Sequence, residues 1–180
     1  MDAFTIGLLA GLAAVLAIAA IVKLRARNKP MGVAEKAEYL SKRRARMLPA
    51  LAIIFLSQQA SFVSQMSAGE HVSAEKAKIS AWLVLSVVLL LGLATKGFWL
   101  EPKEVRDLVD DENTRANRTE AMRWGFLFAM GSAIGIYVLT MFDLVTGREA
   151  VHIVLSFGIA AALLRWGVLE RRAHNFGEQP

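Results

Sequence analysis

Long apolar stretches alternate with charged segments along the whole chain. Five stretches are long and apolar enough to cross a membrane as helices, at residues 3–22, 47–66, 79–97, 124–144 and 150–169. About 20 apolar residues in a helix span the roughly 30 Å hydrocarbon core of a bilayer. The pattern therefore predicts an all-α membrane protein with five transmembrane helices, forming a single integral membrane domain over residues 1–180.

Two charged segments between these stretches predict the orientation. Residues 23–46 carry nine Lys and Arg against two Glu, whereas residues 101–123 carry seven acidic against five basic residues. Of the 21 Lys and Arg residues, 18 would face the cytoplasm if the N-terminus lay outside, in agreement with the positive-inside rule. We therefore expect an outside N-terminus, a cytoplasmic C-terminus and two charged cytoplasmic loops beside an anionic lipid leaflet.

The start of the chain differs from a secretory signal. Asp2 precedes the first apolar stretch, and Lys23, Arg25 and Arg27 follow it. A signal peptide has the opposite charge order. The sequence therefore predicts an uncleaved anchor.

Small residues recur in two of the apolar stretches. Gly7 and Gly11 have G-x-x-x-G spacing in the first, and Gly125, Gly131 and Gly135 lie in the fourth. Such faces allow helices to approach closely in lipid. In the first stretch, small residues that are merely tolerated in an apolar helix are the alternative explanation.

Helix signals also occur within the charged segments. Pro30 and Gly32 should end the first helix, and residues 33–46 then predict a helix near the membrane. Pro102 suits a first helical turn in the second segment, and Asp110 or Asp111 could cap the helix that follows. Because the two segments have opposite net charge, they could pair with each other.

The second apolar stretch ends in polar residues that share one helical face: Ser57, Gln58, Ser61, Ser64 and Gln65. Uncompensated amides in hydrocarbon are costly, so this stripe should meet other helices, water or a ligand. It indicates either interhelical hydrogen bonding or the wall of a solute path.

Asp143 and His152 flank a predicted outside turn at residues 146–149, which would bring them to a similar depth as an outer-face pair. With Glu70 and His71 on the same side, a metal site is conceivable, but these residues lack the local spacing of metal ligands. We expect no metal and no other cofactor.

Composition excludes several classes of function. The chain has no cysteine, 55% hydrophobic residues and a mean hydropathy of +0.42. Thiolate chemistry is therefore excluded, and no Ser/His/Asp order or phosphate-binding loop indicates an enzyme. The basic residues lie between apolar stretches, so direct nucleic-acid binding is not expected despite a pI near 9.8.

Three segments carry a resemblance to known proteins: KRRARMLPALAIIFLSQQ, DDENTRANRTEAMRWGF and LLRWGVLERR, beginning at Lys42, Asp110 and Leu163. In these the chain resembles uncharacterised small bacterial inner-membrane proteins that are often encoded beside a helix-turn-helix regulator of the XRE type. The resemblance implies a multi-pass inner-membrane location and a protein partner.

The leading hypothesis is a non-enzymatic membrane protein whose cytoplasmic charged loops bind or sequester a cytosolic transcriptional regulator. The candidate partner-binding residues are Lys36, Lys42, Arg43, Arg44, Arg46, Asp110, Asp111 and Glu112. The alternative is a small subunit of a transporter or channel that uses the polar stripe, and this version would need an oligomer or partner subunits.

Overall fold

The computed structural model describes residues 3–27, 32–66, 72–95, 103–142 and 144–177. The described residues form six helices and no strand, which confirms the all-α prediction. The helices are α1 (Ala3–Arg27), α2 (Val33–Met66), α3 (Val72–Ala94), α4 (Lys103–Val109), α5 (Glu112–Leu139) and α6 (Gly147–Gly177).

Three segments of the described chain are long and apolar enough to cross a membrane: Ala77–Ala94 in α3, Glu112–Leu139 in α5 and Gly147–Ala173 in α6. The described part of α1 adds a shorter apolar stretch, Phe4–Ala13. By length and composition, these three helices are candidate membrane spans. The count of five spans and their orientation stay predictions.

The chain divides into two compact units, and α2 contributes to both. Unit 1 comprises residues 1–32 and 60–100, and unit 2 comprises residues 33–59 and 101–180. In unit 1, α1 packs against α3. A Cβ atom on Gly7 would collide with Ala77 and Ser80, and one on Gly11 would lie 3.2 Å from the Cα of Ala81. The G-x-x-x-G pair therefore lies in a helix-packing seam, as one of the two interpretations predicted.

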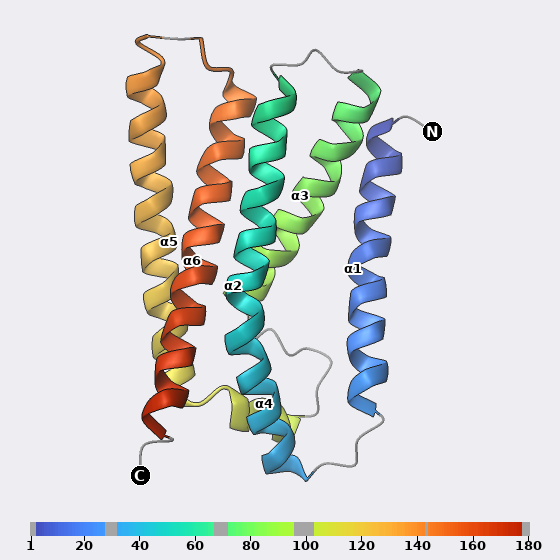
Figure 1. The fold of residues 1–180 in the computed structure, drawn as a ribbon, viewed down its shortest axis with the longest axis vertical. Helices are drawn as coiled ribbons and strands as arrows, with labels where there is room; N and C mark the ends of the chain where they lie inside the picture. The colour runs from blue at the N-terminus through green and yellow to red at the C-terminus, as the bar shows by residue number, and fades with distance from the viewer. Residues whose placement is uncertain (1–2, 28–31, 67–71, 96–102, 143, 178–180) are drawn as a thin grey trace. The chain divides into compact units, whose positions relative to one another are not determined.

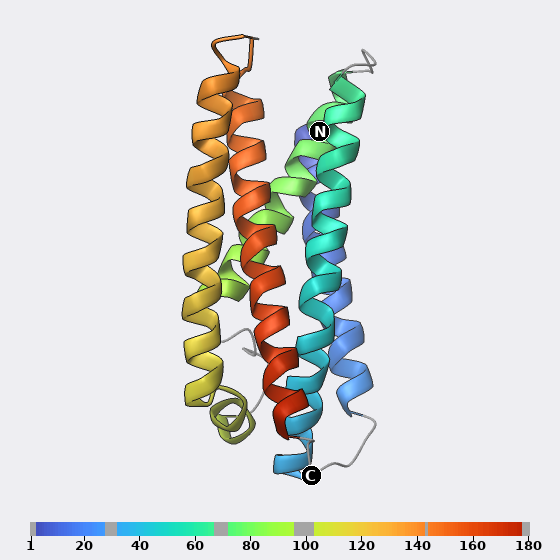
Figure 2. The ribbon, with the colours of Figure 1, turned by 60° about the vertical axis from the view of Figure 1, so that its left-hand side comes forward.

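In unit 2, α6 lies between α2 and α5 (Figures 1 and 2). Small residues permit close contact on its α5 side, because a Cβ on Gly125 would lie 2.8 Å from the Gly158 carbonyl oxygen and from the Cβ of Ala162. On its α2 side, a Cβ on Gly167 would lie 2.6 Å from the ring carbons of Pro49. Glycines thus set the spacing on both sides of α6.

Residues 33–46 of the basic segment and the second predicted span form one helix. α2 runs for 34 residues and includes Pro49 in its interior. Proline removes a backbone donor, but helices in apolar surroundings tolerate it where a neighbouring helix packs against the site. Gly167 of α6 provides that contact, so the charged first half of α2 is a direct extension of its apolar half.

Side-chain caps fix where the later helices begin. Asp111 caps α5 by accepting a hydrogen bond from the Thr114 backbone N–H at 2.7 Å. Thr146 and Glu149 form a reciprocal capping box at the start of α6, with N···O distances of 2.8 and 3.3 Å. Residues 147–149, which we predicted as part of a turn, are instead the first turn of α6, because this capping box starts the helix earlier.

Candidate functional site

A buried polar cluster joins the three long helices of unit 2. It consists of Arg44 on α2, Thr114 on α5, and Trp166 and Glu170 on α6; we call it the Arg44 cluster. Arg44 forms an ion pair with Glu170 at 2.6 Å and donates to the Thr114 hydroxyl at 3.0 Å. The Trp166 indole N–H donates to the second carboxylate oxygen of Glu170 at 3.1 Å, and the Arg44 guanidinium lies 5.3 Å from the Trp166 ring centre.

Burial makes this cluster energetically important. Only 9% of Arg44 and 3% of Glu170 are exposed to solvent. A buried charge is tolerated when its partner and surrounding hydrogen bonds replace water, and removing one partner is strongly destabilising. Both carboxylate oxygens of Glu170 are hydrogen-bonded. The cluster therefore clamps the charged half of α2 to α6 and to the N-terminal turn of α5.

A second contact strengthens the same junction. Arg171, the residue after Glu170, donates from Nε to the backbone carbonyl of Ala45 at 3.1 Å. Ala45 follows Arg44 on α2, so two adjacent residues of each helix are tied together. The first half of α2 is therefore held in one orientation on α6.

The acidic candidates in residues 110–112 have different positions. Asp110 is 4% exposed and pairs with Arg115 at 3.0 Å and Arg118 at 3.8 Å. Asp111 is the α5 cap, and Glu112 is exposed in the first turn of α5. Asp110 and Asp111 thus organise the α4–α5 junction within the protein.

Burial narrows the set of side chains that a partner could reach. Arg44 and Asp110, two of the candidate partner-binding residues, lie in the interior and bind other parts of the chain. The accessible residues lie on the side of α2 opposite the buried Ala37, Leu40 and Arg44. We call this surface the α2 outer face, and it comprises Glu35, Glu38, Tyr39, Lys42 and Arg46.

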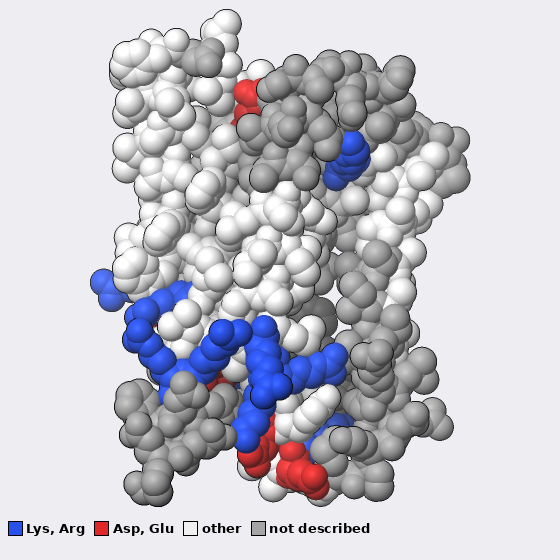
Figure 3. Space-filling model, in the orientation of Figure 1, with Lys and Arg blue, Asp and Glu red and all other residues white. Residues whose placement is uncertain are grey.

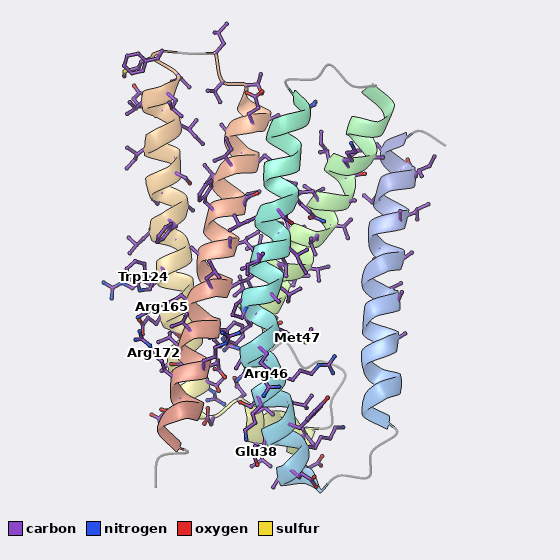
Figure 4. All side chains as sticks on the ribbon, viewed as in Figure 1. Glu38, Arg46, Met47, Trp124, Arg165 and Arg172 are labelled. Atoms are coloured by element: carbon purple, nitrogen blue, oxygen red, sulfur yellow. The ribbon has the colours of Figure 1, made fainter. Side chains whose placement is uncertain are left out.

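The α2 outer face is mixed in charge. Lys42 and Glu38 pair at 3.0 Å as i,i+4 neighbours, while Arg46 is exposed farther along the helix. Lys36 and Arg43 flank this face and are partly exposed. Figure 3 shows Lys and Arg side chains gathered at the end of unit 2 that contains the first half of α2 and the last turns of α6. Figure 4 places Glu38, Arg46 and Met47 along α2.

A second cluster lies on the α5–α6 pair, away from α2. Arg165 of α6 forms an ion pair with Glu120 of α5 through Nε, at 3.0 Å, and through one terminal nitrogen. The guanidinium carbon of Arg165 lies 5.5 Å from the ring centre of Trp124. We call Glu120, Trp124 and Arg165 the Arg165 cluster. Its charges are only partly buried.

The polar stripe of α2 is described in part. The Ser57 hydroxyl donates to the backbone carbonyl of Ile54 at 2.8 Å, which satisfies it within its own helix, and Gln58 is exposed. The side chains of Ser61, Ser64 and Gln65 lie outside the described residues. The choice between helix packing and a solute path therefore stays open for this stripe.

The predicted outer-face pair also lies only partly within the described chain. His152 is buried on α6, one turn from the buried Ser156, whereas Asp143, Glu70 and His71 lie outside the described residues. Over the ranges that the structure describes, no group of three or more His, Asp or Glu side chains is placed to hold a metal ion.

Sequence reasoning missed the partners of Arg44. Glu170 follows the fifth apolar stretch directly and stands four residues after Trp166, a spacing that places both on one helical face. That spacing was a usable signal for an acid directed into the helix bundle. Thr114 carried no comparable signal, because its role depends on the Asp111 cap that fixes the start of α5.

Comparison with protein-family models, with curated protein sequences and with solved structures finds no match to this chain.

Proposed function

We propose that this chain is a five-span bacterial inner-membrane protein with its N-terminus outside, and that its α2 outer face docks a cytosolic regulator. It acts by binding and sequestering that protein at the membrane, without catalysis. The orientation is supported by the distribution of Lys and Arg, of which 18 of 21 lie on the side assigned to the cytoplasm.

One observation carries the docking role: the Arg44 cluster fixes the charged half of α2 to the rest of unit 2. A basic segment that only anchors the protein to lipid needs positive charge near the headgroups, and no defined geometry. Here the segment is a helix with one buried face and is clamped by the 2.6 Å ion pair between Arg44 and Glu170. The exposed side chains opposite are therefore presented in a fixed array.

The composition of that array suits a protein partner. Tyr39 is 45% exposed, with charged residues of both signs around it. Interfaces between proteins are enriched in tyrosine and arginine, and complementary charges set their specificity. The resemblance to proteins encoded beside XRE-type regulators gives the class of partner to be tested.

Photo-crosslinking tests this role. The full-length protein is expressed in its host with a benzoylphenylalanine at position 39, and crosslinked products are identified by mass spectrometry. We expect a single small DNA-binding protein as the main product. Changing Lys42→Glu and Arg46→Glu together should reduce that product at least tenfold, because both changes reverse charge on the α2 outer face.

A matched control uses the chain's other tyrosine. Tyr137 on α5 is 67% exposed and lies in an apolar helix, so the same crosslinker at position 137 should not yield the regulator. Equal yields from positions 39 and 137, or no protein product at position 39 in a folded sample, would overturn the proposal. Deletion of the gene should also alter transcription of the regulator's targets.

A further inference from the structure

Three arginines lie on the α5–α6 pair near the point where its exposed surface becomes apolar. Arg165 is held by Glu120 and by the Trp124 ring in the Arg165 cluster. Arg172 is two helical turns farther along α6, on the same face. Arg123 directly precedes Trp124 on α5 and stands three residues after Glu120, so it is close to the cluster's acid. Figure 4 shows Trp124, Arg165 and Arg172 on the same side of the two helices.

Two of these arginines have no acidic partner among the residues that the structure describes. Arg123 and Arg172 are exposed, and within the described part of the chain neither forms an ion pair. Arg165 has one acidic partner and uses Nε and one terminal nitrogen for it. The group therefore carries a net positive charge after its single carboxylate is counted.

An apolar surface continues directly from this charged group. The Trp124 and Phe128 rings lie 6.1 Å apart at 42°, and both side chains are exposed, as is Leu127 beside them. On α6, Val168 is exposed between Arg165 and Arg172. A molecule with an anionic head and an apolar tail would match this surface, on which the arginines are followed by the Trp124 indole and then by apolar side chains.

We propose that Arg123, Arg165 and Arg172 bind the phosphate of an anionic phospholipid, with an acyl chain along Trp124 and Phe128. Arginine guanidinium groups bind phosphate oxygens in a bidentate manner. Tryptophan is the side chain favoured at headgroup depth. Glu120 and Trp124 hold Arg165 in place, which lowers the entropy cost of binding.

This inference rests on the proposed membrane placement of unit 2, and it concerns a different surface from the α2 outer face. The three arginines lie on α5 and α6, whereas the docking residues lie on α2. Lipid binding and partner docking should therefore respond to different substitutions.

Native mass spectrometry of the full-length protein in detergent tests the proposal, with palmitoyl-oleoyl-phosphatidylglycerol and the matching phosphatidylcholine as probes. We expect retention of phosphatidylglycerol in preference to phosphatidylcholine. Each arginine removed should weaken binding about fivefold, so the pair Arg123→Gln and Arg172→Gln should weaken it about 25-fold. Inorganic phosphate at the same concentration should not displace the lipid, because it lacks the acyl chain.

The matched control removes two arginines from α2 with Arg43→Gln and Arg46→Gln, and should change lipid retention less than twofold. Equal retention of the two lipids, equal loss in both double variants, or displacement by inorganic phosphate would overturn the lipid site. The control pair lies on and beside the docking surface. Whether the docking proposal fails is therefore read from the crosslinking of this control variant to the regulator. That result does not depend on the lipid measurement.

Discussion

At the scale of single residues, burial changes the meaning of a charge. Arg44 belongs to a run of basic residues that predicts a membrane-facing or partner-facing surface. In the structure this arginine points into unit 2, where Glu170, Thr114 and Trp166 surround it. Its neighbour Arg46 is exposed. Residues two positions apart on one helix thus have different roles, one in the fold and one at the surface.

Substitutions at Arg44 and Glu170 should be strongly coupled. Arg44→Met leaves the Glu170 carboxylate buried without its cation, and Glu170→Leu leaves the guanidinium in the same situation, so each should cost about 3–5 kcal/mol. Replacing both removes the two buried charges together, and the double variant should be more stable than either single one. Thermal unfolding in detergent, monitored by tryptophan fluorescence, ranks the stability of the natural protein, the two single variants and the double variant.

A surface ion pair gives the control for this prediction. Lys42 and Glu38 pair at 3.0 Å, but their side chains are 40% and 64% exposed. Exposed i,i+4 pairs contribute about 0.3–0.5 kcal/mol, so Lys42→Met should barely change the melting temperature. If the Arg44 and Glu170 variants behaved in the same way, the cluster would not clamp α2.

At the scale of helices, glycine determines how closely α6 approaches its neighbours. Gly158 and Gly125 meet on the α5 side, and Gly167 meets Pro49 on the α2 side. Lipid is as apolar as a helix surface, so burial of apolar area drives association weakly in a membrane, and close van der Waals packing takes its place. The glycines of α6 therefore help to hold unit 2 together, because they permit close packing on both sides of the helix.

A single methyl group at position 167 should separate α2 from α6. In Gly167→Ala the new Cβ would lie 2.6 Å from the Pro49 ring, which is rigid and cannot move aside, so we expect a loss of about 1–3 kcal/mol. Gly135→Ala is the matched change on α5, where a Cβ meets nothing within 4 Å. That variant should gain about 0.5–1 kcal/mol from helix propensity. Shifts in melting temperature of opposite sign for the two variants would support close packing of α2 against Gly167, and equal shifts would contradict it.

The sequence predicted the positions of the helices better than the contacts between them. Hydropathy located the apolar stretches, and Asp111 was correctly named as one of two possible caps for α5, since both signals are local. The start of α6 was missed because the Thr146–Glu149 capping box was taken for a turn. The Arg44–Glu170 pair joins residues 126 positions apart. Without knowledge of which helix faces meet, no pattern in the sequence could place Arg44 in the interior.

At the scale of the whole molecule, charge is distributed so that unit 2 has two different ends. The connection between α5 and α6 contains the exposed Met141, Phe142 and Leu144. The opposite end contains the first half of α2 and the last turns of α6, where Lys and Arg are concentrated (Figure 3). Moving such a basic end across a bilayer is unfavourable during insertion, so the apolar end should be the one that crosses.

Cysteine labelling tests this orientation directly, because the natural chain contains no cysteine. A cysteine at Leu144, which is 98% exposed in the α5–α6 connection, should react with a membrane-impermeant maleimide added outside intact spheroplasts. A cysteine at Glu38 on the α2 outer face should react only after the membrane is opened. The reverse pattern would invert the topology and remove the docking face from the cytoplasm. Labelling of both positions from outside would contradict the five-span topology, because the three spans at residues 47–66, 79–97 and 124–144 should place Glu38 and Leu144 on opposite sides of the bilayer.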